Sequence, residues 1–268
     1  MQEEKTFDDA LAMMRDLRAR CDWDRAQTHD SLRPYLIEEA HELDDAIRAG
    51  EPGPLRDELG DMLLQVLFHA VIAEERGEFA ARDVPAALVA KMIKRHPHLF
   101  GGGAREPWEK MKARARASLD EGLPAGLPAL HRAHRLQERA AGAGFDWPDT
   151  EGPAQKVEEE LAEVREQLAA RVPPPPGAVD AVPARDATQV ALEGELGDLL
   201  FAVVNLCRRA GVHPAIALDR ANDKFVRRYT AMEALARARG MPLGGASLAE
   251  MDRLWEEVKE GEDEPTAD

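Results

Sequence analysis

The stretch "EEAHELDDAIRAGEPGPLRDELGDMLLQV", residues 38–66, combines helical patterning with an unusual density of acidic residues. Apolar residues recur every three or four positions on both sides of "GEPGP" at 50–54, which is typical of two helices joined by a tight turn. The stretch therefore predicts a helical hairpin, although one that carries many carboxylates. The apolar positions are Leu36, Ala40, Leu43 and Ile47 before the turn, and Leu55, Leu59, Leu63, Val66 and Ala70 after it.

The composition extends this prediction to the whole chain. The 268 residues are 44% hydrophobic, 32% charged and only 5% aromatic, and Ala, Leu, Glu and Arg are abundant. This composition is typical of a soluble globular protein and favours helix over sheet. Because no segment shows convincing strand-like alternation, we expect an all-α fold.

The charge balance excludes some classes of partner. A formal net charge of -16 repels nucleic acid and anionic membrane, so we expect neither as a partner.

The two cysteines, Cys21 and Cys207, form no CxxC motif, which is typical of the reducing cytosol. The acidic start lacks signal-peptide features, and no apolar run approaches the roughly 18 residues of a membrane helix. We therefore expect a cytoplasmic protein.

An internal repeat organises the chain. Five segments of the first half return in the same order in the second half, which chance rarely produces. They are "CDWD" (21–24) with "GFDW" (144–147), "LIEEAHELDDA" (36–46) with "VEEELAEVREQ" (157–167), "DELGDMLLQVL" (57–67) with "GELGDLLFAVV" (194–204), "KMIKRHP" (91–97) with "KFVRRYT" (224–230), and "WEKMK" (108–112) with "WEEVK" (255–259).

The repeat predicts two helical modules. We expect an N-terminal repeat over 1–118, a linker at 119–130 and a C-terminal repeat over 131–260. The Pro-rich segment 171–189 interrupts the second repeat and is expected to be an extended or disordered insertion. Residues 261–268 are expected to be a disordered tail.

The carboxylates of the hairpin fall on shared helix faces. At about 100° per residue, Glu38, Glu39 and Glu42 lie within one arc beside the apolar stripe, and Glu58 and Asp61 share a face of the next helix. Burying such like charges is costly unless a cation offsets them. An all-oxygen donor set suits Mg²⁺, with Mn²⁺ as a possible substitute. The second repeat carries the same set at Glu159, Glu160, Glu163, Glu195 and Asp198.

These motifs resemble those of a known family. "EExxE" followed by "ELGD", present in both halves, is similar to the signature of the MazG nucleoside triphosphate pyrophosphohydrolases, and "KRHPHLF" and "RANDKFVRRY" strengthen the resemblance to its two-repeat form. The resemblance covers about residues 7–260. It implies an all-α bundle that forms a homodimer, and Mg²⁺-dependent cleavage of nucleoside triphosphates to monophosphate and pyrophosphate, with broad specificity.

Basic residues are expected to meet the phosphates. Lys224 and Arg228 are four residues apart and so share a helix face, with Asn222 close by, and Lys259 follows Trp255 by four. The resemblance supports substrate contact by these five residues, although each alone is more often an ordinary surface or core residue. Their counterparts in the first repeat are Lys91, Arg95, Trp108 and Lys112.

Several alternatives stay open. The resemblance favours the second repeat as the main catalytic site, yet the five carboxylates of the first repeat are intact. The resemblance implies that the general base is to be sought first among Glu159, Glu160 and Glu163, and the sequence does not choose between them. A solvated acidic face explains a single such motif, but its repetition argues against that. A di-iron carboxylate bundle needs two ExxH motifs, and only Glu38–His41 provides one. A non-catalytic nucleotide sensor is the remaining alternative.

Overall fold

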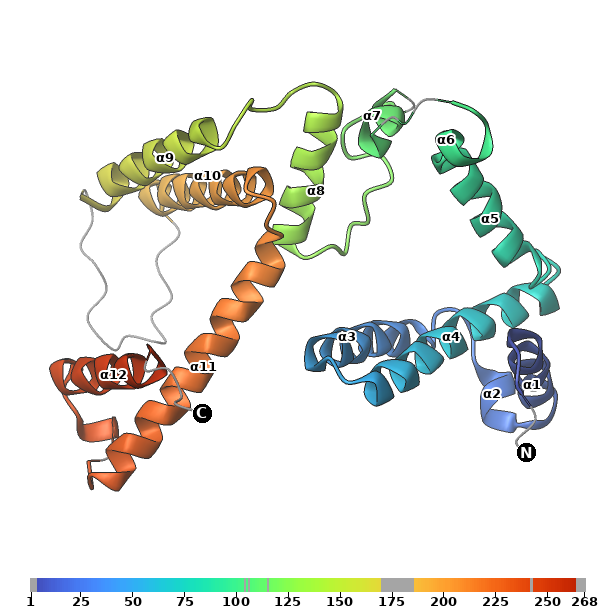
Figure 1. The fold of residues 1–268 in the computed structure, drawn as a ribbon, viewed down its shortest axis with the longest axis horizontal. Coiled ribbons are helices and arrows are strands. Elements are labelled where there is room, and N and C mark those ends of the chain that lie inside the picture. The colour runs from blue at the N-terminus through green and yellow to red at the C-terminus, as the bar shows by residue number, and fades with distance from the viewer. Residues whose placement is uncertain are drawn as a thin grey trace. The chain divides into compact units, whose positions relative to one another are not determined.

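A computed structural model describes residues 4–103, 105, 107–114, 116–169, 186–241 and 243–263. Within these ranges the chain is built of helices and contains no strand, which confirms the all-α prediction (Figure 1). None of the helices in these ranges combines the length and apolarity needed to span a bilayer. The chain divides into two compact units, Met1–Arg105 and Glu106–Asp268, which are described separately below.

The first unit is centred on the hairpin of the quoted stretch. Helices α3 and α4 pack along each other, and α1 packs on α4 and on the short α2. A separate pair, α5 and α6, follows; Pro97 begins α6 directly after α5 ends at Arg95. The helices are α1 (Phe7–Arg20), α2 (Asp22–Ala26), α3 (Arg33–Ala49), α4 (Pro52–Glu75), α5 (Asp83–Arg95) and α6 (Pro97–Phe100).

The core of this unit lies at the C-terminal half of α4. Phe68, Val71 and Ile72 pack against Met14 of α1 and against Leu32, which precedes α3, and each of the five is at most 3% exposed. Burial of each such side chain contributes about 1.5–3 kcal/mol. The N-terminal half of α4, which carries Glu58 and Asp61, lies outside this core, and its carboxylates are therefore free to face a ligand.

The turn of the hairpin is as predicted. Gly50 ends α3 in the left-handed conformation, with φ +72°, and its amide donates to the Ala46 carbonyl oxygen at 3.3 Å. Pro52 then begins α4, where its missing N–H costs no hydrogen bond. The sharp reversal lets α4 return along α3 and sets the Glu58 turn opposite the Glu39 turn.

The second unit repeats the hairpin as α9 and α10, which lie side by side in opposite directions (Figure 1). Helix α8 packs on α7, α10 and α11, while the long α11 packs on α12. Met232 and Ala236 of α11 and Leu254 of α12 form a second small core. The helices are α7 (Trp108–Ala113), α8 (Ala129–Gly142), α9 (Glu151–Ala169), α10 (Ala187–Arg209), α11 (Pro214–Ala238) and α12 (Leu248–Asp263), with a 3-10 turn at Leu243–Gly245.

Two predicted boundaries need correction. Helix α10 begins at Ala187, inside the predicted insertion 171–189, because Asp186 caps it by accepting from the Gln189 amide at 2.9 Å. Helix α12 continues to Asp263, so the predicted disordered tail does not begin at 261. Residues 171–185 of the insertion and 264–268 of the tail lie outside the described residues.

The division between the units also differs from the repeat boundary at 118. Helix α7, which the repeat assigns to the first half, packs on α8 in the second unit. Its Glu109 accepts from Arg116 at 2.8 Å and from Arg135 of α8 at 3.0 Å, and the Glu109 backbone lies so close to Gly142 that a Cβ there would approach it to 2.9 Å. The predicted linker at 119–130 is non-helical up to Pro128.

Two glycines of the hairpin should respond oppositely to substitution. Gly50→Ala forces an L residue into the left-handed region and should destabilise the first unit by about 1 kcal/mol. Gly60→Ala, within α4 and with open space around its Cβ, should stabilise it by roughly 0.5–1 kcal/mol. Thermal unfolding followed by circular dichroism without divalent cations measures both. Equal shifts of the same sign would contradict the assignment of the turn.

Candidate functional site

Three carboxylates meet between α9 and α10 in the second unit. Glu160 and Glu163, one turn apart on α9, and Glu195 of α10 each offer an oxygen within 4.8 Å of the other two. Glu160 is only 5% exposed. The convergence follows from the local sequence, because residues three apart share a helix face and α10 returns antiparallel to α9.

The carboxylates of this cluster differ in their electrostatic surroundings: Glu163 is repelled by its neighbours, whereas Glu160 is neutralised by a lysine. Burial and the neighbouring charges of Glu160 and Glu195 raise the pKa of Glu163. Lys156, one turn before Glu160, places its Nζ 2.6 Å from an oxygen of Glu160 and 2.8 Å from one of Glu159, and these contacts raise the pKa of Lys156. Lys156 thus supplies the positive charge that allows Glu160 to be buried.

The remaining two carboxylates of the predicted set lie at the edge of this cluster. Glu159 is exposed, pairs with Lys156 and is not one of the three converging groups. Asp198, one turn after Glu195 on α10, lines a cavity together with Glu160 and Lys156. Of the five predicted residues, the structure thus brings Glu160, Glu163 and Glu195 together, while Glu159 pairs with Lys156 outside this group.

The cavity beside the cluster has a volume of about 640 Å³ and mostly apolar walls. It is bounded by α8, α9, α10 and the loop before α9. Arg208 of α10 holds this loop by donating to Asp146 at 3.1 Å, and Arg209 donates to the Pro148 carbonyl oxygen at 2.9 Å. The aromatic wall consists of Phe145, Trp147 and Phe201, and the polar lining includes Gln137, Asp146, Asn205 and Arg208.

An equivalent carboxylate cluster lies in the first unit. Glu39 of α3 and Glu58 and Asp61 of α4 offer oxygens within 4.8 Å of one another. In the repeat, Glu39 corresponds to Glu160 and Glu58 to Glu195. Burial, followed by the charges of Asp61, Glu42, Glu58 and Glu38, raises the pKa of Glu39. All five predicted carboxylates of the first repeat are therefore close enough to interact.

The first unit differs beside its cluster. There the ring of Trp23 packs edge-on against Tyr35 and Phe68, with centroids 6.3 Å and 6.4 Å apart. Trp23 corresponds to Trp147 in the repeat, Tyr35 to Lys156 and Phe68 to Asn205. Aromatic rings thus occupy positions whose counterparts in the second unit line the cavity.

Both clusters fit a hard divalent cation. Their donors are carboxylate oxygens alone, which suits Mg²⁺ or Mn²⁺ rather than a thiolate-binding metal. Burial and the charges of Glu42, Asp61 and Asp57 raise the pKa of Glu58, and one of its oxygens is buried without a hydrogen-bond partner. Such an oxygen lacks a positive partner that a bound ion can supply. Neither cluster includes His41, so the ExxH motif of the di-iron alternative does not contribute to it.

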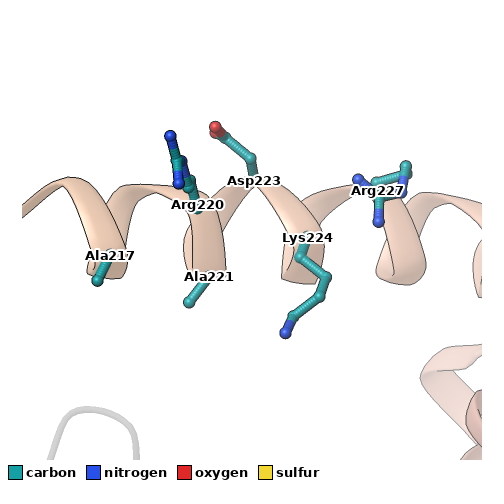
Figure 2. Close-up of a pocket in the computed structure, with 6 residues that line it drawn as sticks. All are labelled: Ala217, Arg220, Ala221, Asp223, Lys224 and Arg227. Carbon is teal, nitrogen blue, oxygen red and sulfur yellow. The ribbon is translucent and has the colours of Figure 1, made fainter. Parts of the chain in front are cut away.

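The predicted phosphate-binding residues lie on α11 and α12. Arg228 donates to Glu262 at 2.8 Å, and Lys259 to Glu256 at 2.8 Å, while the ring of Trp255 packs against Phe225 at 5.5 Å between centroids. Figure 2 shows Lys224 pointing to the opposite side of α11 from Arg220 and Asp223. Asn222 is an exposed residue of the same helix.

Their first-repeat counterparts are divided between the units. Lys91 and Arg95 lie on α5 of the first unit, whereas Trp108 and Lys112 lie on α7 of the second. Lys112 places its Nζ 4.8 Å from the centre of the Trp108 ring, a cation–π contact. This set is therefore not held within one unit, unlike the set on α11 and α12.

Known proteins resemble this chain both over its first unit and over nearly its whole length. Residues 27–100, which include the first carboxylate cluster, match the MazG nucleotide pyrophosphohydrolase domain. The chain is 42% identical over 267 residues to the nucleoside triphosphate pyrophosphohydrolase/pyrophosphatase MazG of Thermotoga maritima, covering 96% of this chain and 97% of that protein. It is 40% identical over 265 residues to the nucleoside triphosphate pyrophosphohydrolase of Escherichia coli K12, covering 94% and 95%.

The chain belongs to the MazG family. The resemblance inferred from "EExxE" and "ELGD" is thereby confirmed. A protein of Mycolicibacterium smegmatis named nucleoside triphosphate pyrophosphohydrolase is 45% identical over 150 residues, about half of this chain.

Sequence reasoning missed several residues that surround the carboxylate cluster of the second unit. Lys156 was visible in principle, because a Lys four residues before a buried Glu is a recurrent helix pair. In the sequence, Asp146 and Trp147 stand out only as part of the repeat, although they line the cavity. Phe201, Asn205 and Arg208 line one face of α10, yet nothing in the sequence separates that face from an ordinary core stripe.

Replacing Glu39 of the first cluster by a neutral residue should stabilise the protein when no divalent cation is present. The raised pKa of Glu39 means that the native state holds its proton more tightly, so stability falls as pH rises above the ordinary value of 4.5. Glu39→Gln should therefore raise the melting temperature at neutral pH but not near pH 4, and should reduce the stabilisation that Mg²⁺ gives to this unit.

Asp45→Asn, on an exposed turn of the same helix, serves as the control and should leave the Mg²⁺ response unchanged. The measurement is a melting curve at both pH values with and without Mg²⁺. A melting temperature lowered at neutral pH by Glu39→Gln would contradict the argument.

Proposed function

We propose that this protein hydrolyses nucleoside triphosphates to monophosphate and pyrophosphate in the cytoplasm, with Mg²⁺ held by the carboxylates of the second unit. The activity named for the relatives from Thermotoga maritima and Escherichia coli supports the reaction. The single observation that favours the second unit is the cavity beside Glu160 and Asp198, where Lys156 and Asn205 stand at the positions that Tyr35 and Phe68 occupy in the first unit.

The ligands and the proton acceptor come from α9 and α10. Glu160, Glu163, Glu195 and Asp198 would hold Mg²⁺, which when bound neutralises phosphate charge and lowers the pKa of water. Water attacks the α-phosphorus, the bond from that phosphorus to the bridging oxygen breaks, and pyrophosphate leaves. One of Glu159, Glu160 and Glu163 accepts the proton of the attacking water.

The cavity is suited to the base. Phe145, Trp147 and Phe201 can stack on the face of any nucleobase, and stacking of this kind discriminates weakly between bases. We therefore infer broad specificity. Lys156 neutralises Glu160 in the structure. If a bound metal ion neutralised Glu160 instead, the Lys156 ammonium group would be free to pair with a phosphate oxygen.

The basic residues of α11 and α12 would neutralise the leaving pyrophosphate. Arg228 and Lys259 are held by Glu262 and Glu256 in pairs that are at least partly solvent-exposed, and such pairs typically contribute only about 0–1 kcal/mol. A triphosphate, with several negative charges, can therefore compete for them. Lys224, Asn222 and Trp255 complete the proposed contact set.

We further propose a homodimer. Large apolar side chains stand exposed on the helices of both units, among them Ile37 of α3, Leu59 of α4, Leu200 of α10 and Val226 of α11. A second copy would remove these surfaces from water.

Substitution of equivalent glutamates separates the roles of the two units. Glu160→Ala should lower the rate of pyrophosphate release by at least about 100-fold, as expected when a metal ligand beside the reacting phosphate is lost. Glu39→Ala should retain most of the activity. The measurement is pyrophosphate and monophosphate release from a panel of nucleoside triphosphates with Mg²⁺.

Loss in both variants would mean that both units turn over or depend on each other. Release of orthophosphate in place of pyrophosphate would exclude the proposed reaction. Tight nucleotide binding without turnover by the unsubstituted protein would instead favour the alternative function, a non-catalytic nucleotide sensor.

Phe201→Ala tests the base-binding role of the cavity. Loss of one stacking ring should raise KM for every nucleoside triphosphate by roughly 5- to 150-fold, given about 1–3 kcal/mol per stacked base. Inhibition by inorganic tripolyphosphate, which has no base, should be unchanged. Leu196→Ala on an exposed face of the same helix is the control. Equal weakening of tripolyphosphate inhibition would show that Phe201 supports the carboxylates and not the base.

A further inference from the structure

Three histidines gather on the side of α8 that faces away from the cavity. His131 and His134 lie one turn apart on α8, and His213 immediately precedes α11. The His213 ring lies between the other two, with centroids 5.1 Å from His131 and 4.7 Å from His134. The cluster therefore joins two elements that are more than 70 residues apart in sequence.

Two nitrogens of this cluster are unsatisfied. Nδ1 of His134 and Nδ1 of His213 are buried and have no hydrogen-bond partner. An orphaned buried polar atom is costly and rare in native proteins. By contrast, His29 and His69, which stack in the first unit, satisfy both Nδ1 atoms by an Nδ1–Nδ1 hydrogen bond of 2.7 Å. The second-unit cluster thus retains lone pairs that no protein group uses.

The separations of the His213 ring from the His131 ring and from the His134 ring suit ligands of one tetrahedral ion. With a metal–nitrogen bond of about 2.0–2.1 Å, the centre of each ring lies about 3.2 Å from the ion, and two tetrahedral ligands then have centroids about 5.2 Å apart. The observed 4.7 Å and 5.1 Å are close to this value. The ring nitrogens do not yet converge within 4.8 Å, so rotation of the rings about χ2 must accompany binding.

The surroundings also suit a metal-bound imidazole. Glu138 lies one turn after His134, with an oxygen 3.6 Å from His134 Nε2, so a small approach would let it accept from Nε2–H and leave Nδ1 free to bind an ion. Burial lowers the pKa of His131 and of His134, which keeps both rings neutral and able to bind. The nearby cation, Arg135, is already neutralised by Glu109 and Glu138.

We propose that His131, His134 and His213 bind one divalent ion of the Zn²⁺ class, distinct from the carboxylate-bound Mg²⁺. Imidazole nitrogen favours Zn²⁺, Co²⁺ and Ni²⁺ over Mg²⁺, whereas the carboxylate clusters have the opposite preference. The ion links α8 to the start of α11. Because Gln137 of α8 lines the cavity one turn after His134, the linkage also holds one wall of that cavity in place.

Cobalt titration of chelator-treated protein tests this site. With Mg²⁺ in excess to fill the carboxylates, we expect about one Co²⁺ per chain with the intense visible absorption of four-coordinate, nitrogen-bound Co²⁺, which six-coordinate carboxylate sites lack. Zn²⁺ should displace it and remove the colour. Zn²⁺ should also raise the melting temperature of the second unit.

His213→Ala and His134→Ala should abolish the absorption and the Zn²⁺-dependent rise in melting temperature. His69→Ala, which breaks the His29–His69 pair of the first unit, is the matched control and should leave both unchanged. Circular dichroism shows that each variant is folded. Absorption that survives His213→Ala in the folded protein, or that disappears only with His69→Ala, would overturn the proposal, as would the absence of any four-coordinate Co²⁺ spectrum.

Discussion

Mutual repulsion of carboxylates held on adjacent helices is the constraint on which both units depend. A helical hairpin packs through its apolar stripe, and the acidic residues beside that stripe must approach one another as a consequence. The pKa of Glu39, of Glu58 and of Glu163 is raised by this proximity together with burial. The apolar packing therefore stores an electrostatic cost at one end of each hairpin, and a cation relieves it.

The two units offset this cost differently. In the second unit Lys156 supplies a cation from within the protein, and the space beside it is open and lined by aromatic rings. In the first unit the residue corresponding to Lys156 is Tyr35, which packs against Trp23. A cluster without an internal cation has the stronger demand for a metal ion, while a cluster with a cavity has room for a base. The metal binding and the base binding that we propose would thus be separable properties of one repeated hairpin.

The sequence predicted the hairpins well because periodicity and turn chemistry are local. "GEPGP" contains the glycine that adopts φ +72°, and its Pro52 begins α4. The cavity was not predictable in this way, because Phe201 and Trp147 come from distant segments that only the packing of α8 and α10 brings together. The place of α7 was not predictable for a similar reason, because Glu109, a partly buried carboxylate, joins it to Arg135 of α8, which is distant in sequence.

The net charge of -16 gives the metal ion a second role in the proposed reaction. A free triphosphate approaching Glu160, Glu163 and Glu195 meets charges of its own sign, and in the low dielectric of a partly buried cluster this repulsion is much stronger than in water. Lys156 alone offsets only one of the charges, and the basic residues of α11 and α12 are themselves paired with glutamates. Productive binding therefore requires that the divalent ion arrive with the nucleotide or before it, because only then does the acidic cluster attract phosphate.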